Sequence, residues 1–421
     1  MDQKNIPLPI RSALIPVFYK NFHCLAQECK DSCCEGWSIQ FNKKDYLRLR
    51  RLDAPPALRE RLDRGVRRVK DKTPDSKAYG NFDLVGNGGR CPFLDPDGLC
   101  AIQRACGHDA LPHVCTTYPR HINYSPAAKE YSLSPSCEGV LQQLWDLPNG
   151  VEFVEDPLPK SEHRIVNVVQ GESLMLYFTP IRSLFIDILQ DRALSLAERM
   201  LYLGMTIQRL QKEDWTSLDL DSWVQQTVSL ADAGMIKEMI SNIPGNRGMY
   251  LMQNLKALSK ISLTEEGWTT EVFDALEVVK QRIDIGPAKN NKADMKTQFR
   301  TNFSPKAYED ALAQFQTAFP DKEYFFENLM VASALYKKFP ILTSREALWK
   351  SYMDLCNLYS LYRFTSILGC KQSATKERLF HMIVKTSRAT LHSRDLFREF
   401  QADFFQHDSS TLAHMAILLK G

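Results

Sequence analysis

The chain has 421 residues, of which 44% are hydrophobic and 24% are charged. This composition is typical of a globular protein, and the length suggests two or three domains with a sizeable core. The formal net charge of +3 is close to balance, so the composition does not favour nucleic-acid binding. No apolar run reaches about eighteen residues and no signal peptide is evident. We therefore expect a cytoplasmic protein without a membrane span.

The first 20 residues predict an extended lead-in, because three prolines block a regular helix. A cysteine group with the spacing C-x4-C-x3-C-C follows it. Its members are Cys24, Cys29, Cys33 and Cys34. Adjacent side chains of an extended backbone point in opposite directions. We therefore expect Cys33 and Cys34 to share one metal centre only if the chain turns there.

Residues 38–41 alternate and predict a short strand. Asn42 is a good N-cap for a helix that begins near Lys43, and a second helix is expected over 57–69. Both predicted helices are rich in arginine. The arginines are Arg48, Arg50, Arg51, Arg59, Arg61, Arg64, Arg67 and Arg68. They form either a solvated face with local ion pairs or a docking surface for an acidic protein. Aromatic residues are not interleaved with them, which disfavours nucleic acid.

Residues 79–90 contain four glycines. They either cradle a phosphate or carboxylate or, as we favour, turn the backbone toward Cys91, since no strand–loop–helix pattern surrounds them. The stretch from Cys91 to Cys100 predicts a hairpin with Asp97-Gly98 at its turn.

Beyond residue 150 the apolar residues recur at helical spacing. Helices are expected near 174–188, where Pro180 should kink or divide the helix, and near 200–210. Further helices are expected over 217–243, 264–285, 324–338, 345–368, 376–391 and 395–419, with a polar loop at 286–296. The predicted fold is mainly α. It has a cysteine-rich, metal-binding domain with short β-hairpin elements (1–150), a helical middle domain (160–286) and a helical C-terminal domain (298–421).

Nine of the eleven cysteines lie between Cys24 and Cys137. In a cytosolic protein, thiols stay reduced and grouped cysteines usually bind metal. Closing the loop from Cys34 to Cys91 costs roughly 3–4 kcal/mol of chain entropy. Metal binding at a structural site can contribute about 10–16 kcal/mol of folding free energy. No C-x2-C pair of the kind common in zinc sites is present, and an iron–sulfur cluster tolerates irregular spacing. Spacing alone leaves zinc and iron open.

Several motifs resemble those of the flagellin lysine N-methylase family. The matching stretches are Tyr19 to Cys24, Cys29 to Trp37, Cys91 to Asp95, Gly98 to Cys100, Leu111 to Cys115, Tyr118 to Arg120 and Ser132 to Cys137. The resemblance implies an iron–sulfur protein that uses S-adenosylmethionine to methylate lysines of flagellin. The expected cluster is [4Fe-4S]. The candidate ligands are Cys24, Cys29, Cys33, Cys34, Cys91, Cys100, Cys115 and Cys137. Cys106 falls outside the family pattern.

Methyl transfer needs a neutral amine, an aligned donor and little water. The sequence has no G-x-G-x-G motif of the usual methyltransferase sheet, so we expect an open iron to bind the amino and carboxylate groups of the donor. Tyr118, Asp95 and Glu35 flank the candidate ligands and are either bases or supporting structure. Two other functions stay open, a zinc-stabilised protein-binding module and an iron–sulfur oxidoreductase or electron carrier. Neither nucleic acid nor membrane is an expected partner.

Overall fold

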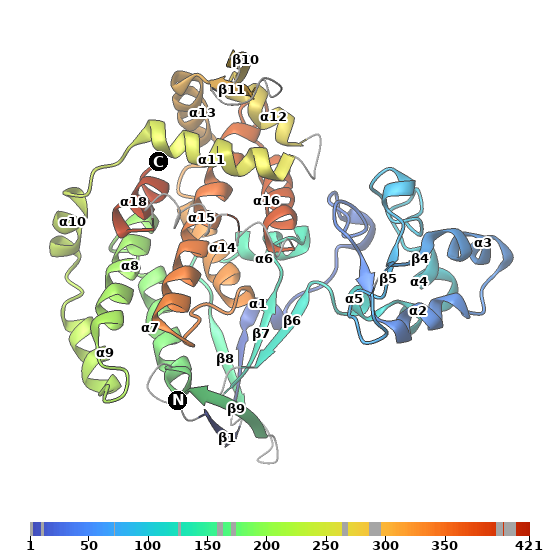
Figure 1. Ribbon diagram of the computed structural model, residues 1–421, viewed down its shortest axis with the longest axis horizontal. Coiled ribbons are helices and arrows are strands. Elements are labelled where there is room, and N and C mark those ends of the chain that lie inside the picture. The colour runs from blue at the N-terminus through green and yellow to red at the C-terminus, as the bar shows by residue number, and fades with distance from the viewer. Residues whose placement is uncertain are drawn as a thin grey trace.

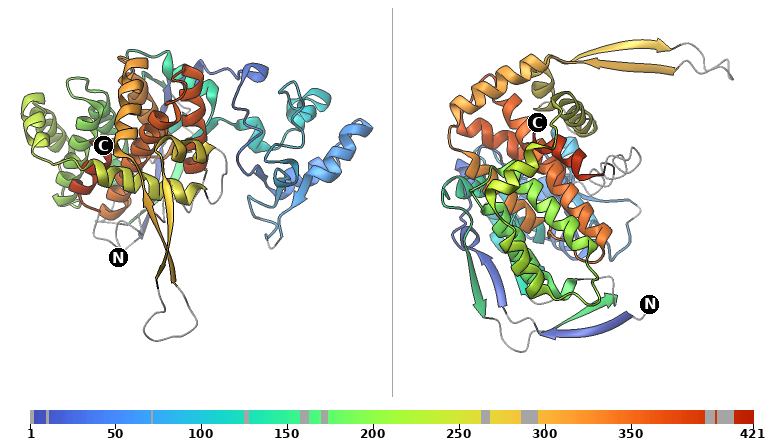
Figure 2. Two further views of the ribbon diagram at one scale, coloured as in Figure 1. Left: turned by 90° about the horizontal axis from the view of Figure 1, so that it is seen from above. Right: turned by 90° about the vertical axis from the view of Figure 1, so that its left-hand side faces the viewer.

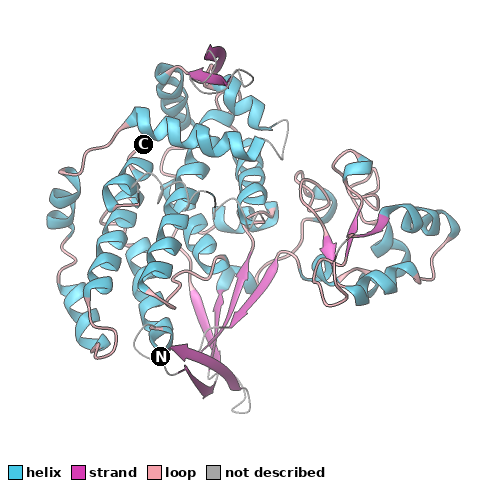
Figure 3. Ribbon diagram, viewed as in Figure 1, coloured by secondary structure: helices cyan, strands magenta, loops and turns pink. Residues whose placement is uncertain are grey.

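The computed structural model describes residues 3–9, 12–70, 72–124, 128–157, 163–169, 174–262, 268–285, 296–392, 399 and 410–421. As predicted, the chain is mainly helical (Figure 3). A small unit, here called the cysteine lobe (residues 34–117), lies beside a larger helical body (Figure 1). No helix in the described part is long and apolar enough to cross a membrane.

The cysteine lobe is built from short elements. Its helices are α2 (Lys43–Arg50), α3 (Pro56–Gly65), α4 (Ala101–Cys106) and α5 (His113–Thr117), with a sheet of order β3 (Gln40–Phe41), β5 (Gly80–Phe82) and β4 (Val66–Arg68). The side chain of Asn42 accepts a hydrogen bond from the Asp45 amide at 2.9 Å, so the predicted cap is confirmed. The predicted helix 57–69 is wrong at its end, because Val66 leaves the helix and pairs with Phe82 in the sheet.

The predicted hairpin between Cys91 and Cys100 is confirmed only at its turn, because its two sides share an isolated bridge between Leu94 and Cys100 and form no strand. The Asp95 amide donates to the Leu99 carbonyl at 2.9 Å, and Gly98 has the positive φ of 81° that this turn requires. In the glycine-rich stretch before it, the Asp83 carboxylate accepts from the Gly86 amide at 2.9 Å. The Gly86 amide, which could have donated to a bound phosphate or carboxylate, is thus bonded within the chain. This favours the interpretation of these glycines as a turn toward Cys91.

The body contains strands that the sequence pattern did not predict. They form a sheet of order β6 (Arg120–Tyr124), β7 (Ala128–Leu133), β2 (Ser12–Pro16) and β8 (Phe153–Pro157), and a pair of β1 (Gln3–Pro9) with β9 (His163–Val169). β2 runs parallel to β7, although the chain between them includes the whole cysteine lobe. The strands on either side of the lobe therefore anchor it to the body.

The remaining elements are helices apart from one hairpin. The helices are α1 (Val17–Lys20), α6 (Glu138–Trp145), α7 (Phe178–Gln190), α8 (Leu196–Lys212), α9 (Leu220–Ser229), α10 (Ala233–Ser241), α11 (Arg247–Ser262), α12 (Trp268–Ala275), α13 (Pro305–Ala318), α14 (Glu323–Tyr336), α15 (Arg345–Gly369), α16 (Lys376–Leu391) and α18 (Leu412–Leu419). Short 3-10 turns occur at η1 (Ala26–Glu28), η2 (Val85–Asn87), η3 (His108–Ala110) and η4 (Met175–Tyr177).

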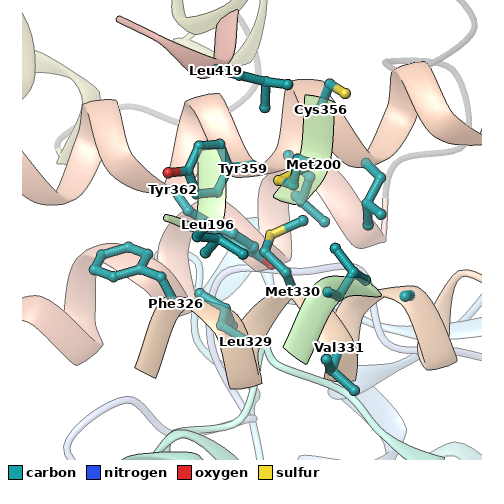
Figure 4. Close-up of a cluster of buried hydrophobic side chains, with 14 of the residues drawn as sticks. Leu196, Met200, Phe326, Leu329, Met330, Val331, Cys356, Tyr359, Tyr362 and Leu419 are labelled. Carbon is teal, nitrogen blue, oxygen red and sulfur yellow. The ribbon is translucent and has the colours of Figure 1, made fainter. Parts of the chain in front are cut away.

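α15 is the centre of the body. It is buried on nearly all sides, as expected of a helix that is apolar around its whole circumference. Figure 4 shows Cys356, Tyr359 and Tyr362 of α15 facing Met200 of α8 and Met330 of α14.

Some predicted helices differ from the observed ones. The predicted helix 217–243 is two helices, because the Asp232 side chain caps a new one. The predicted helix 264–285 is wrong at its end, where β10 (Val279–Ile285) pairs with β11 (Lys296–Asn302) in a hairpin that projects from the body (Figure 2). Pro180 lies in the first turn of α7, where a proline breaks no helical hydrogen bond, so no kink results.

Two predictions fall largely outside the described residues, the loop 286–296 and the N-terminal part of the helix 395–419. The division into domains 1–150, 160–286 and 298–421 stays a prediction. Two hydrophobic cores are present. The core of the cysteine lobe runs from Ile39 to Leu111, whereas Phe18, Phe22 and Leu133 join the core of the helical body.

Candidate functional site

The chain turns at the adjacent cysteines Cys33 and Cys34. The Glu35 amide donates to the Ser32 carbonyl at 3.2 Å, which closes the turn. The Cys91 amide donates to the Cys34 carbonyl at 2.7 Å and so ties the second cysteine segment to the first. This segment, residues 32–35, is called the thiol turn below. The condition for Cys33 and Cys34 to share one centre is therefore met.

One group of thiols surrounds the thiol turn on the lobe side. Its members are Cys33, Cys34, Cys91, Cys100 and Cys115. A hydrogen bond with Cys33 lowers the pKa of Cys34, but a bond with Cys91 and burial outweigh it and raise the pKa to about 12. Burial, reinforced by nearby Cys34, also raises the pKa of Cys115 well above its usual value. The thiols of Cys34 and Cys115 are therefore neutral at pH 7, and a metal would displace their protons on binding.

A second group lies on the body side of the same turn. Its members are Cys24, Cys29, Cys33 and Cys137. Burial, reinforced by Cys33 and Cys24, raises the pKa of Cys137 to about 12. Burial also raises the pKa of Cys29, whose thiol donates to a Glu138 carboxylate oxygen at 3.4 Å. Cys33 belongs to both groups, so all eight candidate ligands gather around one turn.

The positions of these thiols can be compared with the geometry of known metal sites. In the part of the chain that the structure describes, no three His, Cys, Asp or Glu side chains are placed to hold a single ion. Structural zinc draws four ligands to about 2.0–2.3 Å from one point. An iron–sulfur cluster also takes thiolates from several segments of a chain, so the choice between zinc and iron stays open. The ligand set itself stays a prediction.

The other cysteines lie apart from these groups. The Cys106 thiol donates to the Asp53 carbonyl at 3.6 Å, and no interaction with another thiol is seen for it in the described residues. Cys356 and Cys370 are buried in the helical body. This separation agrees with the exclusion of Cys106 from the candidate ligands.

One face of α16 contacts the thiol turn and its neighbours. Its members, called the basic stripe below, are His381, Lys385, Arg388 and His392. They are spaced by four, three and four residues and so share one side of the helix. Arg388 donates to the carbonyls of Asp31 at 2.8 Å and Glu35 at 3.0 Å, one on each side of the turn. His381 pairs with the Asp31 carboxylate at 2.8 Å.

Three aromatic rings stack on one another next to the thiol turn and the basic stripe. The indole of Trp37 donates to the Cys33 carbonyl at 2.7 Å and stacks on the rings of Tyr118 and His392. His392 is hydrogen-bonded through Ser136 to the Tyr118 hydroxyl, at 2.8 and 3.0 Å. Burial and the nearby Arg388 charge lower the pKa of His392 to about 4, so its ring is neutral at pH 7.

The three residues proposed as bases or supporting structure have different surroundings. Burial raises the pKa of Tyr118 well above its usual value, so it stays protonated. The Asp95 carboxylate pairs with Arg61 at 2.7 Å, and the Glu35 carboxylate pairs with Arg90 at 2.6 Å. These contacts favour supporting roles for all three.

Six of the eight arginines form ion pairs, three of them with a carboxylate about one helical turn away. The pairs are Arg48–Asp45, Arg50–Asp63, Arg59–Asp63, Arg61–Asp95, Arg64–Glu60 and Arg67–Asp83. This is the solvated face that the sequence allowed as one interpretation. A docking role for it stays a prediction.

The basic stripe was not predicted as part of the site. The 4-3-4 spacing of its basic side chains on a predicted helix was a visible signal, but nothing near α16 in the sequence pointed to the cysteines. The pairing of His381 with Asp31 joins residues 350 positions apart.

Comparison with known proteins supports one family. The model of the FliB lysine N-methylase C-terminal domain matches residues 182–418, which include α16. Two proteins named lysine-N-methylase, from Salmonella choleraesuis and Salmonella typhimurium, are each 25% identical over 287 residues, covering 61% of this chain and 68% of theirs. The flagellar biosynthetic protein FliU of Salmonella muenchen is 32% identical over 144 residues, 33% of this chain and 80% of its own length. No solved structure matches. The chain belongs to the FliB lysine N-methylase family.

Proposed function

We propose that this protein transfers methyl groups from S-adenosylmethionine to lysine side chains of flagellin in the cytoplasm, with an iron–sulfur cluster held by the cysteines around the thiol turn. The family match over residues 182–418 carries the proposal. The names of the relatives add lysine methylation and the flagellum as context. The gathering of eight thiols supports the cluster.

The residues that would hold the cluster are drawn from both thiol groups, with the exposed Cys33 common to them. When bound, a [4Fe-4S] cluster would supply an iron with an open position for the donor. The chain's own residues supply the surroundings. Arg388 fixes the backbone on both sides of the thiol turn, and the rings of Trp37, Tyr118 and His392 stack beside it.

The transfer itself is a displacement. The lone pair of a neutral lysine nitrogen forms a bond to the methyl carbon while the carbon–sulfur bond breaks. Its electron pair goes to sulfur, which becomes a neutral thioether, and the methylated amine releases a proton to solvent. The exposure of Cys33 and the partial exposure of Trp37 make this side of the turn the accessible one for a protein substrate.

The proposal is tested by incubating anaerobically purified protein with flagellin and a donor that carries a deuterated methyl group. Intact-mass measurement should show labelled methyl groups on flagellin lysines. Cys33→Ser should abolish this transfer, and Cys106→Ser, a change of the same kind outside the ligand set, should not. Flagellin that gains no mass with iron-loaded protein would show that the proposed function is wrong.

Metal analysis of the same protein separates the alternatives. Iron with sulfide is expected, because eight cysteines match the pattern of an iron–sulfur family. Stoichiometric zinc would favour a zinc-stabilised binding module instead. A cluster that cycles between redox states without binding the donor would favour an electron carrier.

A further inference from the structure

Large apolar side chains are exposed at the outer side of α9 and α10. Five large apolar residues in the described part of the chain are more than half exposed, and four of them lie between residues 228 and 239. These four, called the apolar edge below, are Val228 (60% exposed), Leu230 (57%), Met235 (59%) and Met239 (51%). Single exposed apolar residues are ordinary, but a group of them marks an interaction surface.

α10 packs on the body with one face only. Ile236 and Ile240 on that face are buried, and α10 contacts α8. Met235 and Met239 are one helical turn apart on another face, so their side chains form a short row along the helix. In Figure 1, α9 and α10 lie at the edge of the body away from the cysteine lobe.

The same segment is acidic. Residues 213–246 contain six acidic residues and one basic residue, although the whole chain has a net charge of +3. The acidic residues are Glu213, Asp214, Asp219, Asp221, Asp232 and Glu238. Asp221 lies two helical turns before Val228 on α9, and Glu238 lies one turn after Met235 on α10. Both carboxylates are exposed, and neither forms a hydrogen bond or ion pair with another described residue.

The cations near these helices do not neutralise the apolar edge. Arg209 lies over the Trp223 ring at 5.6 Å, and the Lys420 ammonium donates to two carbonyls at the C-terminal end of α10. Lys237 lies two residues after Met235 and so does not share its face. The exposed carboxylates are therefore left to attract cations from outside the chain.

We propose that the apolar edge, with Asp221 and Glu238, docks the protein substrate through an amphipathic helix that carries lysines beside its apolar stripe. The stripe packs on Met235 and Met239, whose flexible side chains adapt to different neighbours. The lysines pair with the two carboxylates. This inference rests on the proposed function and adds a second surface for its substrate.

The charges favour the substrate over two other occupants. In a symmetric dimer the apolar edge would meet its own copy, and carboxylates would face carboxylates. An anionic membrane surface would repel the same carboxylates. A helix that carries lysines meets no such repulsion.

The docked lysines are not the ones that are methylated. Methyl transfer needs a neutral amine, whereas a neighbouring carboxylate favours the charged ammonium. The helices α8, α15 and α16 also lie between the apolar edge and the cysteine lobe (Figure 1), and each is about 10 Å across. A six-residue peptide spans at most about 20 Å. It cannot contact both surfaces, but a whole protein can.

Steady-state methylation of whole flagellin and of a six-residue peptide around one methylated lysine separates docking from chemistry. The double variant Met235→Gln and Met239→Gln should raise KM for flagellin about 10- to 30-fold, because apolar contact is lost, and should leave kcat unchanged. It should methylate the peptide at the wild-type rate. Leu176→Gln, a 42% exposed leucine outside the apolar edge, is the matched control and should affect neither substrate.

Salt tests the carboxylates. The double variant Asp221→Asn and Glu238→Gln should raise KM for flagellin about 2- to 10-fold at low salt, because exposed ion pairs are weak. Its difference from the wild type should disappear at high salt. Glu309→Gln removes an exposed carboxylate on α13 and is the matched control. Titration of the iron-loaded protein with flagellin, without donor, should show the same order of effects on binding.

Hydrogen exchange in flagellin identifies the occupant. On binding, one helical, lysine-bearing segment should exchange more slowly, and the methionine variant should not produce this protection. Protection confined to a segment without helix or lysines would contradict the inference.

Other outcomes distinguish the inference from the proposed function. Wild-type KM and affinity for flagellin in both double variants would overturn the inference and leave the proposed function intact. A methionine variant that changes only self-association, or only binding to phosphatidylglycerol vesicles, would assign the apolar edge to a second copy or a membrane and also overturn it. Flagellin that binds at the apolar edge but gains no methyl mass would support the docking surface and overturn the proposed function.

Discussion

The two hydrophobic cores differ in size and in the residues that complete them. The core of the helical body joins many long helices around α15, and its large side chains are almost wholly buried. The core of the cysteine lobe is small, and Cys34, Cys91, Cys100 and Cys115 lie in it or against it. A core of this size rarely supplies more than about 3–5 kcal/mol. The comparison teaches that the body can fold on apolar packing alone, whereas the lobe, with its small core, depends more on contacts outside that core, such as those with α16.

The largest expected effect is loss of the lobe when its metal is removed. Chelation, or Cys33→Ser, Cys91→Ser, Cys100→Ser or Cys115→Ser, should remove iron and abolish an early thermal transition, since metal binding can contribute about 10 kcal/mol or more. The transition of the body should remain. Calorimetry with and without chelator measures both. A single transition that chelator leaves unchanged would contradict the division into two units.

The next effect belongs to the body. Buried Glu327 bonds Arg199 at 2.6 Å and Arg192 at 2.9 Å. Glu327→Gln leaves the buried Arg199 without its counter-charge, so we expect the free energy of unfolding of the body to fall by about 3–5 kcal/mol. Denaturant unfolding followed in the body should show it, with iron content unchanged. Glu346→Gln, which removes an exposed partner of Lys350, should cost less than about 1 kcal/mol.

A smaller effect is expected at the junction. Arg388→Met removes the two hydrogen bonds to the carbonyls of Asp31 and Glu35. We therefore expect the free energy that stabilises the contact between lobe and body to fall by about 2–3 kcal/mol. Hydrogen exchange should show faster exchange in residues 31–37, with α15 unaffected. Arg388→Lys keeps the charge but has fewer hydrogen-bond donors, so its exchange rate in residues 31–37 should lie between those of the wild type and Arg388→Met. Unchanged exchange would mean that the thiol turn holds its shape without α16.

The smallest effect is expected at Cys106. Its thiol makes one long hydrogen bond, to the Asp53 carbonyl. Cys106→Ser should therefore change the free energy of unfolding by no more than about 0.5 kcal/mol and leave iron content as in the wild type. Iron loss equal to that of Cys91→Ser would place Cys106 among the ligands and enlarge the set to nine.

Much of the helical fold was predictable, because amphipathic spacing and capping residues act locally. Asn42 capped its helix as expected, and α14, α15 and α16 lie within two residues of their predicted bounds. The strands β7, β8 and β9 were not predicted, because each pairs with a strand that precedes the lobe and its register is set by that distant partner.

The candidate site was predictable only on its cysteine side. The thiols stand close together in sequence, so their chemistry is visible there. The contribution of α16 depends on tertiary contacts, and Lys385 and His392 resemble any polar side chain of an amphipathic helix. Trp37 was part of the motif behind the family resemblance, but its stacking on Tyr118 and His392 joins segments that are far apart in the sequence.

The distance in sequence between the thiol turn and the basic stripe has a consequence for synthesis. Asp31 leaves the ribosome 350 residues before His381. At about 5–20 residues per second, this is a delay of roughly 20–70 s. During that time the cysteines are made but the helix that fixes the thiol turn is not. A nascent chain therefore carries these cysteines without their final support, and loading of the proposed cluster is expected to follow release of the completed chain.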